Sequence, residues 1–293
     1  MVTNWRLNLL KFGMLALATA FAIALSITSI SRPVLAQAAT TIDFGPDIEE
    51  ADRHRASLRV AEAEAAYQRA YAKSPEDPTV LVRYASFKRT LGAYDETIAL
   101  LNRAEESMAN GAVLMGGPEY LQLTKGITFY RTGVDYEAAA VIFQKFIEDY
   151  PDSAAYHLHL AYSEIGRGNQ EEALKNLAIA EQLYGDRLIS YRAATLALGY
   201  AKLDRTHDVM RLFGRLQEME SVSQAAWAAA YIALGNHEQA LGPLEDAVTN
   251  PETISGAANV LYFLADNPFD DPALDGPRFQ ALFDQLRGRR ASG

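Results

Sequence analysis

Three arginines, Arg55, Arg89 and Arg131, recur along the chain at intervals of 34 and 42 residues. A guanidinium group is planar and permanently charged, and it can donate two parallel hydrogen bonds to one carboxylate. A fold that brought these arginines together could therefore bind a carboxylate or an acidic peptide. The alternative is that the arginines pair with acids of neighbouring elements and have only a structural role.

Few other residues have the types and spacing that catalysis or metal binding requires. His157 and His159 would point about 200° apart on a helix, whereas two ligands of one metal ion need a spacing of three or four residues. Acid pairs such as Glu105-Glu106 are typical of a solvated helix face rather than of paired catalytic carboxylates. The sequence therefore predicts no catalytic residue, no metal site and no cofactor.

Composition narrows the class of protein. The chain has 293 residues, of which 49% are hydrophobic and 22% are charged, as in ordinary folded proteins. Its formal net charge of −10 disfavours general nucleic-acid binding, which needs a surplus of Lys and Arg. There is no cysteine, which excludes disulfides, thiolate metal sites and a lipidated cysteine.

The first 36 residues are predicted to be a signal peptide. Arg6 and Lys11 precede a stretch without charge, residues 12–31, and the run Val34-Leu35-Ala36 suits a signal peptidase that cleaves after Ala36. Cleavage would remove three of the 27 basic residues and none of the 37 acids, leaving 24 against 37, a net charge of −13. We expect a periplasmic or secreted protein, with residues 37–43 as a linker.

The alternative for this segment is an uncleaved anchor, because residues 12–30 could just span a bilayer. The protein would then be held at the inner membrane and face the periplasm. In this alternative the N-terminal segment is the only part of the chain expected to contact a membrane.

From about residue 44 the chain has the pattern of amphipathic helices separated by Gly, Asn, Asp or Pro. A small residue, a large residue four positions later and a third residue three positions further recur at intervals of 34, 42, 34 and 67 residues. The recurring sets are Ala63, Tyr67 and Ala70; Thr97, Leu101 and Ala104; Ala139, Phe143 and Phe146; Ala173, Leu177 and Ala180; and Ala240, Leu244 and Ala247.

This pattern resembles the tetratricopeptide repeat, a helix pair of 34 residues with small residues where its two helices touch. Ala85, Ala161 and Ala228 match the small contact position of the first helix, and Gly92, Gly168 and Gly235 match the turn. The resemblance implies an all-α, right-handed superhelical solenoid with a C-terminal capping helix. Six units are predicted, at 44–77, 78–111, 120–153, 154–187, 188–220 and 221–254, with an insert at 112–119 between the second and third.

Residues 255–293 are predicted to form C-terminal capping helices and a basic tail. A short helix is expected at 255–265, a turn-rich link at 266–272, and a closing helix around 275–283. The tail contains Arg287, Arg289 and Arg290.

The resemblance further implies that the first helices of the units line a concave groove. Arg55, Arg89 and Arg131 would then lie on one wall, with Ser86, Thr124 and Thr128 beside them. The later units would contribute an apolar and aromatic surface that includes Leu158, Tyr162 and Tyr191. Such a groove could bind an extended or helical peptide with an acidic or carboxylate end.

The segment from Phe143 to Ser153 also resembles tetratricopeptide proteins of the bacterial envelope. We therefore expect an exported scaffold or adaptor that binds a partner protein or peptide, in cell-envelope assembly or maintenance. The alternatives are the membrane-anchored form of this adaptor and an accessory enzyme built on the solenoid. No nucleic-acid partner is expected.

Overall fold

The computed structural model describes residues 45–250 and 257–288. The chain divides into two units, Met1–Asp43 and Phe44–Gly293, and the second contains all the described residues. The predicted signal peptide, the linker 37–43, residues 251–256 and the tail residues 289–293 lie outside them. No helix in the described ranges has the length and apolarity that a bilayer crossing requires.

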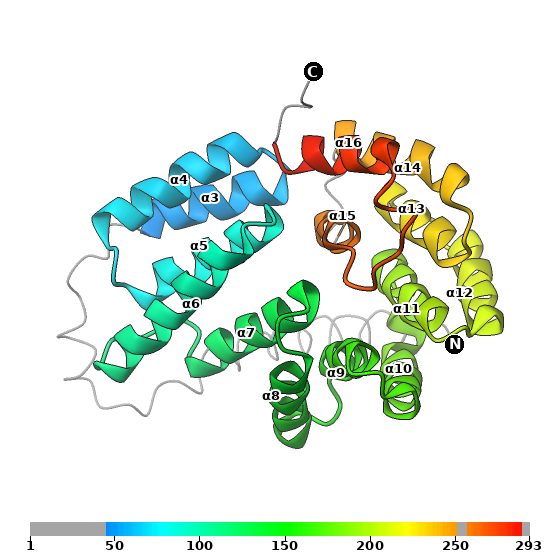
Figure 1. Ribbon diagram of the computed structural model, residues 1–293, viewed down its shortest axis with the longest axis horizontal. Coiled ribbons are helices and arrows are strands. Elements are labelled where there is room, and N and C mark those ends of the chain that lie inside the picture. The colour runs from blue at the N-terminus through cyan, green and yellow to red at the C-terminus, as the bar shows by residue number, and fades with distance from the viewer. Residues whose placement is uncertain (1–44, 251–256, 289–293) are drawn as a thin grey trace, which may run out of the picture. The chain divides into compact units, whose positions relative to one another are not determined.

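The described part of the second unit is built from α-helices without strands (Figure 1), as predicted. A short 3-10 helix, Gly185–Arg187, follows the α-helix Gln170–Tyr184. The α-helices are α3 (Gly45–Ala56), α4 (Val60–Lys73), α5 (Pro78–Thr90), α6 (Tyr94–Ala109), α7 (Pro118–Thr132), α8 (Tyr136–Asp149), α9 (Ala154–Gly166), α10 (Gln170–Tyr184), α11 (Ser190–Lys202), α12 (Thr206–Glu218), α13 (Gln224–Ala233), α14 (His237–Thr249), α15 (Ala257–Asp266) and α16 (Pro277–Leu286).

From α3 to α14, each odd-numbered helix packs against the even-numbered helix that follows it. Each predicted unit thus corresponds to one helix pair. The third pair begins earlier than expected, inside the predicted insert, because Pro118 opens α7. Proline suits the first turn of a helix, where its missing N–H would have no partner within the helix.

Close packing explains the spacing of the small residues. Ala85, Ala161 and Ala228 are fully buried, which allows the paired helices to approach each other. The turns between the helices need a left-handed backbone, and Gly92 and Gly168 provide it with φ of 72° and 77°.

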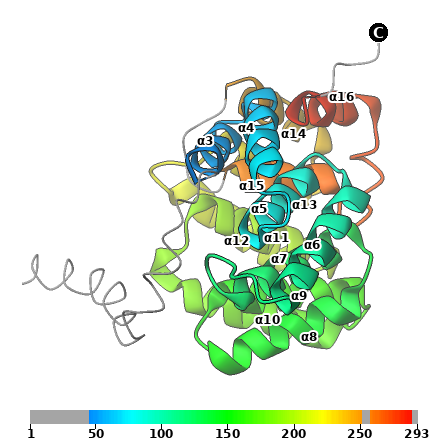
Figure 2. The same cartoon turned by 90° about the vertical axis from the view of Figure 1, so that its left-hand side faces the viewer.

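α15 departs from the expected C-terminal cap. It packs against α7, α11 and α13, and Figures 1 and 2 show it among the repeat helices rather than beyond the last of them. Every residue from Val260 to Ala265 is buried, and so is the side chain of Asp266. α16 packs against α14, the second helix of the last pair. The residue after α16, Arg287, lies beside the turn at Gly92.

In the described part of the chain, the apolar core consists of two clusters, one with residues from Ile48 to Leu121 and the other with residues from Tyr130 to Leu286. Where they meet, α5 and α7 bury polar side chains, among them Arg89, Thr128 and Arg131. We call this region the polar layer. It interrupts the apolar core at the positions where the sequence predicts a binding groove.

Gly166 offers a test of the helix packing. A Cβ atom at Gly166 would lie 2.1 Å from two ring carbons of Tyr136, which opens the neighbouring α8. Gly166→Ala is therefore expected to lower the free energy of unfolding by about 1–3 kcal/mol, because the ring must move. Chemical denaturation monitored by circular dichroism measures this change.

Gly214→Ala is the matched control. Gly214 lies within α12, and a Cβ atom there would have no neighbour within 4 Å. This substitution should leave stability unchanged or raise it by up to about 1 kcal/mol. Equal destabilisation by both substitutions would contradict the packing described for α8 and α9.

Candidate functional site

The arginines of the predicted series lie together. Arg55, Arg89 and Arg131 occupy the last turns of α3, α5 and α7, three helices that pack in sequence. We call these three residues the arginine arc. Arg89 is 5% exposed and Arg131 is 7% exposed, whereas Arg55 is half-buried. Most of the arc is thus covered by protein.

A carboxylate of the chain itself lies at the arc. Arg131 Nη2 forms an ion pair with Asp266 Oδ2, and the side chain of Asp266 is fully buried at the end of α15. The hydroxyl of Tyr94 donates a hydrogen bond of 3.0 Å to Asp266 Oδ1. Arg287 Nη2 lies 3.6 Å from the same oxygen and donates a 2.7 Å hydrogen bond to the carbonyl oxygen of Ala265.

Opposing effects act on Asp266. Burial is the larger effect and raises the pKa of its carboxyl group, while the positive charges of Arg131, Arg89 and Arg287 and the hydrogen bond from Tyr94 act to lower it. The arginines also face the C-terminal end of α15, where unpaired carbonyl groups carry partial negative charge. The arc therefore stabilises both the ionised carboxylate and the end of the helix that bears it.

Arg89 has a different environment. Its Nη1 donates a 3.2 Å hydrogen bond to Thr128 Oγ1, and among the described residues no acid forms an ion pair with it. Burial and the nearby charges of Arg131 and Arg55 lower its pKa to about 9. The same positive field reaches His159: burial, Arg89 and Arg131 lower the pKa of its imidazole to about 3, so this side chain is neutral.

The predicted polar residues beside the arc are buried too. Ser86, Thr124 and Thr128 are 6%, 4% and 0% exposed. Thr124 and Thr128 donate hydrogen bonds to carbonyl oxygens one turn earlier in α7, those of Tyr120 and Thr124. Thr128 therefore links its own helix backbone to Arg89.

The predicted apolar part of the groove contacts α15 directly. Tyr162 is 3% exposed; its ring stacks on Phe263 of α15 with centroids 5.1 Å apart and meets Phe269 edge-on at 5.4 Å. Leu158 is buried, and Tyr191 is half-buried with the guanidinium of Arg192 over its ring. Binding of a partner by these residues stays a prediction, since the chain itself covers most of them.

Sequence reasoning missed Asp266 and α15 as parts of this site. It assigned Asp266 to a turn-rich link, whereas the residue ends a helix. The available signal was the run Val260–Ala265 within this helix, which is apolar or aromatic at every position and is followed by one acid. A helical segment that is hydrophobic all round is typical of a buried position.

The two histidines considered as metal ligands have separate partners. His157 contacts Asn176 Oδ1 at 2.8 Å and the carbonyl oxygen of Pro151 at 2.9 Å. His159 contacts the hydroxyl of Tyr130 at 3.0 Å. In the described part of the chain, no three acidic or histidine side chains are grouped so that they could hold a metal ion.

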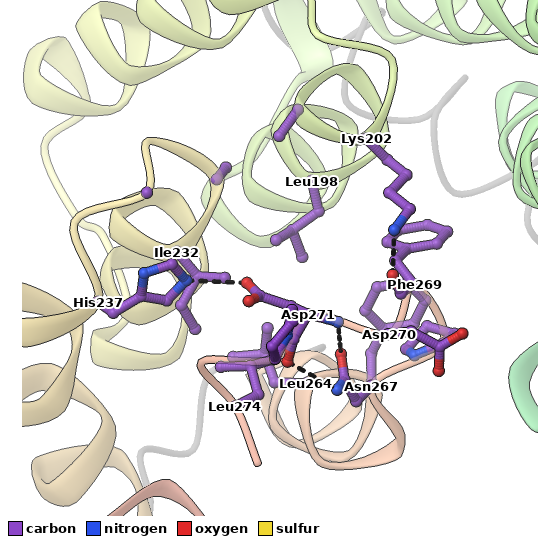
Figure 3. A pocket seen from close by; sticks show the side chains of 16 residues that line it. Leu198, Lys202, Ile232, His237, Leu264, Asn267, Phe269, Asp270, Asp271 and Leu274 are labelled. Carbon is purple, nitrogen blue, oxygen red and sulfur yellow. Dashed lines mark hydrogen bonds and ion pairs between the residues drawn. The ribbon is translucent and has the colours of Figure 1, made fainter. Parts of the chain in front are cut away.

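A cavity of about 310 Å³ lies under the segment that joins α15 to α16 (Figure 3). Its polar groups bind this segment: His237 Nε2 pairs with Asp271 Oδ2 at 2.8 Å, and Lys202 donates to the carbonyl oxygen of Phe269. The amide of Asp271 donates a 2.9 Å hydrogen bond to Asn267 Oδ1. These hydrogen bonds hold the segment against α11 and α14, so the polar groups of the cavity already have partners within the chain.

Comparisons with known proteins agree with this geometry. Residues 120–153 match the family model described as Tetratricopeptide repeat, a range that covers α8 and most of α7. Fourteen chains of solved structures also match. Among them is the crystal structure of a tetratricopeptide repeat protein from Parabacteroides merdae ATCC 43184, with a TM-score of 0.52 and 16% identity over 77% of this chain and 85% of that chain.

At 16% sequence identity, the structural likeness shows that the two chains share a fold. It confirms the predicted all-α repeat solenoid. A search of curated proteins finds no significant match.

Proposed function

We propose that this chain, a tetratricopeptide-repeat protein, is an exported, non-catalytic scaffold that binds a partner protein through a helix with an acidic end. The repeat and the fold support protein binding as the general function. The observation that carries the finer proposal is the position of α15, an apolar helix whose terminal carboxylate meets the arginine arc.

α15 provides a template for the partner. Its apolar side chains, such as Phe263, pack on the groove residue Tyr162, and its acid pairs with Arg131. A partner helix of the same kind would make the same two sets of contacts after replacing α15. Because α15 is attached to the groove's own chain, its effective concentration is high and it competes strongly with such a partner.

The proposal of a non-catalytic role rests on how the titratable groups near the groove are engaged. Asp266 is ion-paired, His159 is neutral and bound to Tyr130, and His237 is bound to Asp271. Each of these contacts stabilises the packing of the chain. These structural contacts are the roles that a non-catalytic scaffold needs from Asp266, His159 and His237.

Export is proposed from the N-terminal segment, with its two early basic residues, its uncharged stretch 12–31 and its cleavage motif at 34–36. The mature charge of −13 fits a protein partner better than nucleic acid or an anionic membrane surface. We place the scaffold in the periplasm, in cell-envelope assembly or maintenance, and retain the membrane-anchored form as the alternative.

Peptide exchange tests partner recognition. A labelled peptide of residues 257–266, capped at both ends, should bind the full-length Asp266→Asn variant at least about ten-fold more tightly than it binds the wild type. The variant's own helix lacks the carboxylate that the peptide supplies. Fluorescence anisotropy measures the affinity, and circular dichroism verifies that the variant is folded.

Three controls accompany this measurement. The peptide carrying Asp266→Asn should not show the gain, and the variant Asp275→Asn, which changes an exposed acid, should behave like the wild type. Tyr94→Phe removes the same hydrogen bond from Asp266 of α15 and from the carboxylate of the peptide, so it should give no gain. If the folded Asp266→Asn variant bound the peptide no better than the wild type does, the proposed recognition would be wrong.

Export is tested separately by N-terminal sequencing of the protein isolated from its native cells. Cleavage after Ala36 should give a mature chain that begins at Gln37. A chain that begins at or near Met1 would contradict cleavage and favour the membrane-anchored form.

A further inference from the structure

The charges around the arginine arc do not balance. Arg131 and Arg287 both share the single carboxylate of Asp266, and Arg89 and Arg55 form no ion pair among the described residues. Among the described residues, Asp266 is thus the only acid that forms an ion pair with this group of four arginines. Burying an uncompensated charge is costly, which is why buried arginines normally have an anionic partner.

Unpaired hydrogen-bond donors accompany this excess of positive charge. The Nε atoms of Arg89, Arg131 and Arg287 are buried and have no hydrogen-bond partner among the described residues. Native structures contain few such atoms, and a missing water or ion is a common reason for them. Water would satisfy the N–H groups without supplying the missing negative charge.

Neighbouring dipoles compensate only part of the charge. Arg55, Arg89 and Arg131 lie in the last turns of their helices, and Asp266 ends α15. The C-terminal end of each helix carries roughly half a negative charge. Arg287 follows the end of α16, so five such ends and one carboxylate leave the four arginines with a small excess of positive charge, which an anion would neutralise.

We propose that the arginine arc holds a small oxyanion, a phosphate or a carboxylate, between Arg89 and Arg131 beside Asp266. An oxyanion fits because a guanidinium donates paired hydrogen bonds to two oxygens of one group. Arg89 is the principal ligand, because it is the buried arginine that forms no ion pair with any described acid. The site exists with α15 in place, so it does not depend on the exchange of a partner helix.

Titration calorimetry on the full chain tests the site. Inorganic phosphate is one probe and acetate is the other, each added in place of chloride at constant ionic strength. One anion should bind per chain, and Arg89→Met should abolish binding. The Tm of the wild type should rise by about 5 °C as the anion approaches 100 times its Kd, and this rise should saturate.

The control variant is Arg278→Gln, because Arg278 is exposed and pairs with the exposed Glu238. It should bind the anion as the wild type does. Non-specific salt effects would raise the Tm of all variants alike and without saturation. Binding of phosphate alone identifies a phosphate site, and binding of acetate identifies a carboxylate site.

Absence of binding of either anion to the wild type would overturn the proposal. Equal binding by folded Arg89→Met would also overturn it. If Arg89→Met does not fold, Thr128→Val replaces it, since this change removes the one hydrogen bond that orients Arg89. It should weaken binding by at least about ten-fold, because an oriented donor is lost, and unchanged affinity would count against the site.

Discussion

A buried ion pair between α7 and α15 joins parts of the chain that the repeat pattern alone would leave apart. Arg131 belongs to the third helix pair and Asp266 to a helix that follows the last pair. Their contact lies where the two apolar clusters meet. Once buried there, each charge requires the other, because an isolated ion in this position would cost several kcal/mol.

The position of α15 follows from this constraint. An apolar helix can pack in many apolar surroundings, but its acidic end can be buried only beside positively charged side chains. The arginine arc provides them, and Tyr162 provides an aromatic surface for Phe263. Shape and charge together thus specify one position and one direction for the helix, and these are the properties by which a groove would also distinguish partner helices.

The repeat units could be predicted from the sequence because their contacts are local and periodic. Ala85, Ala161 and Ala228 recur for reasons of close packing. Arg55, Arg89 and Arg131 recur with the repeat and lie in the last turns of α3, α5 and α7. Asp266 could not be found in this way. It has no counterpart in the repeat, and its contact with Tyr94 joins residues 172 positions apart. Only the apolar and aromatic run Val260–Ala265 before it indicated burial.

A double-mutant cycle on Arg131 and Asp266 tests most directly whether this ion pair positions α15. The cycle uses Arg131→Met, Asp266→Asn and their combination, with the free energy of unfolding from chemical denaturation. Each single change should cost about 3 kcal/mol or more, and the combined cost should fall short of the sum by at least about 1.5 kcal/mol. Costs that add within about 0.5 kcal/mol would contradict the account.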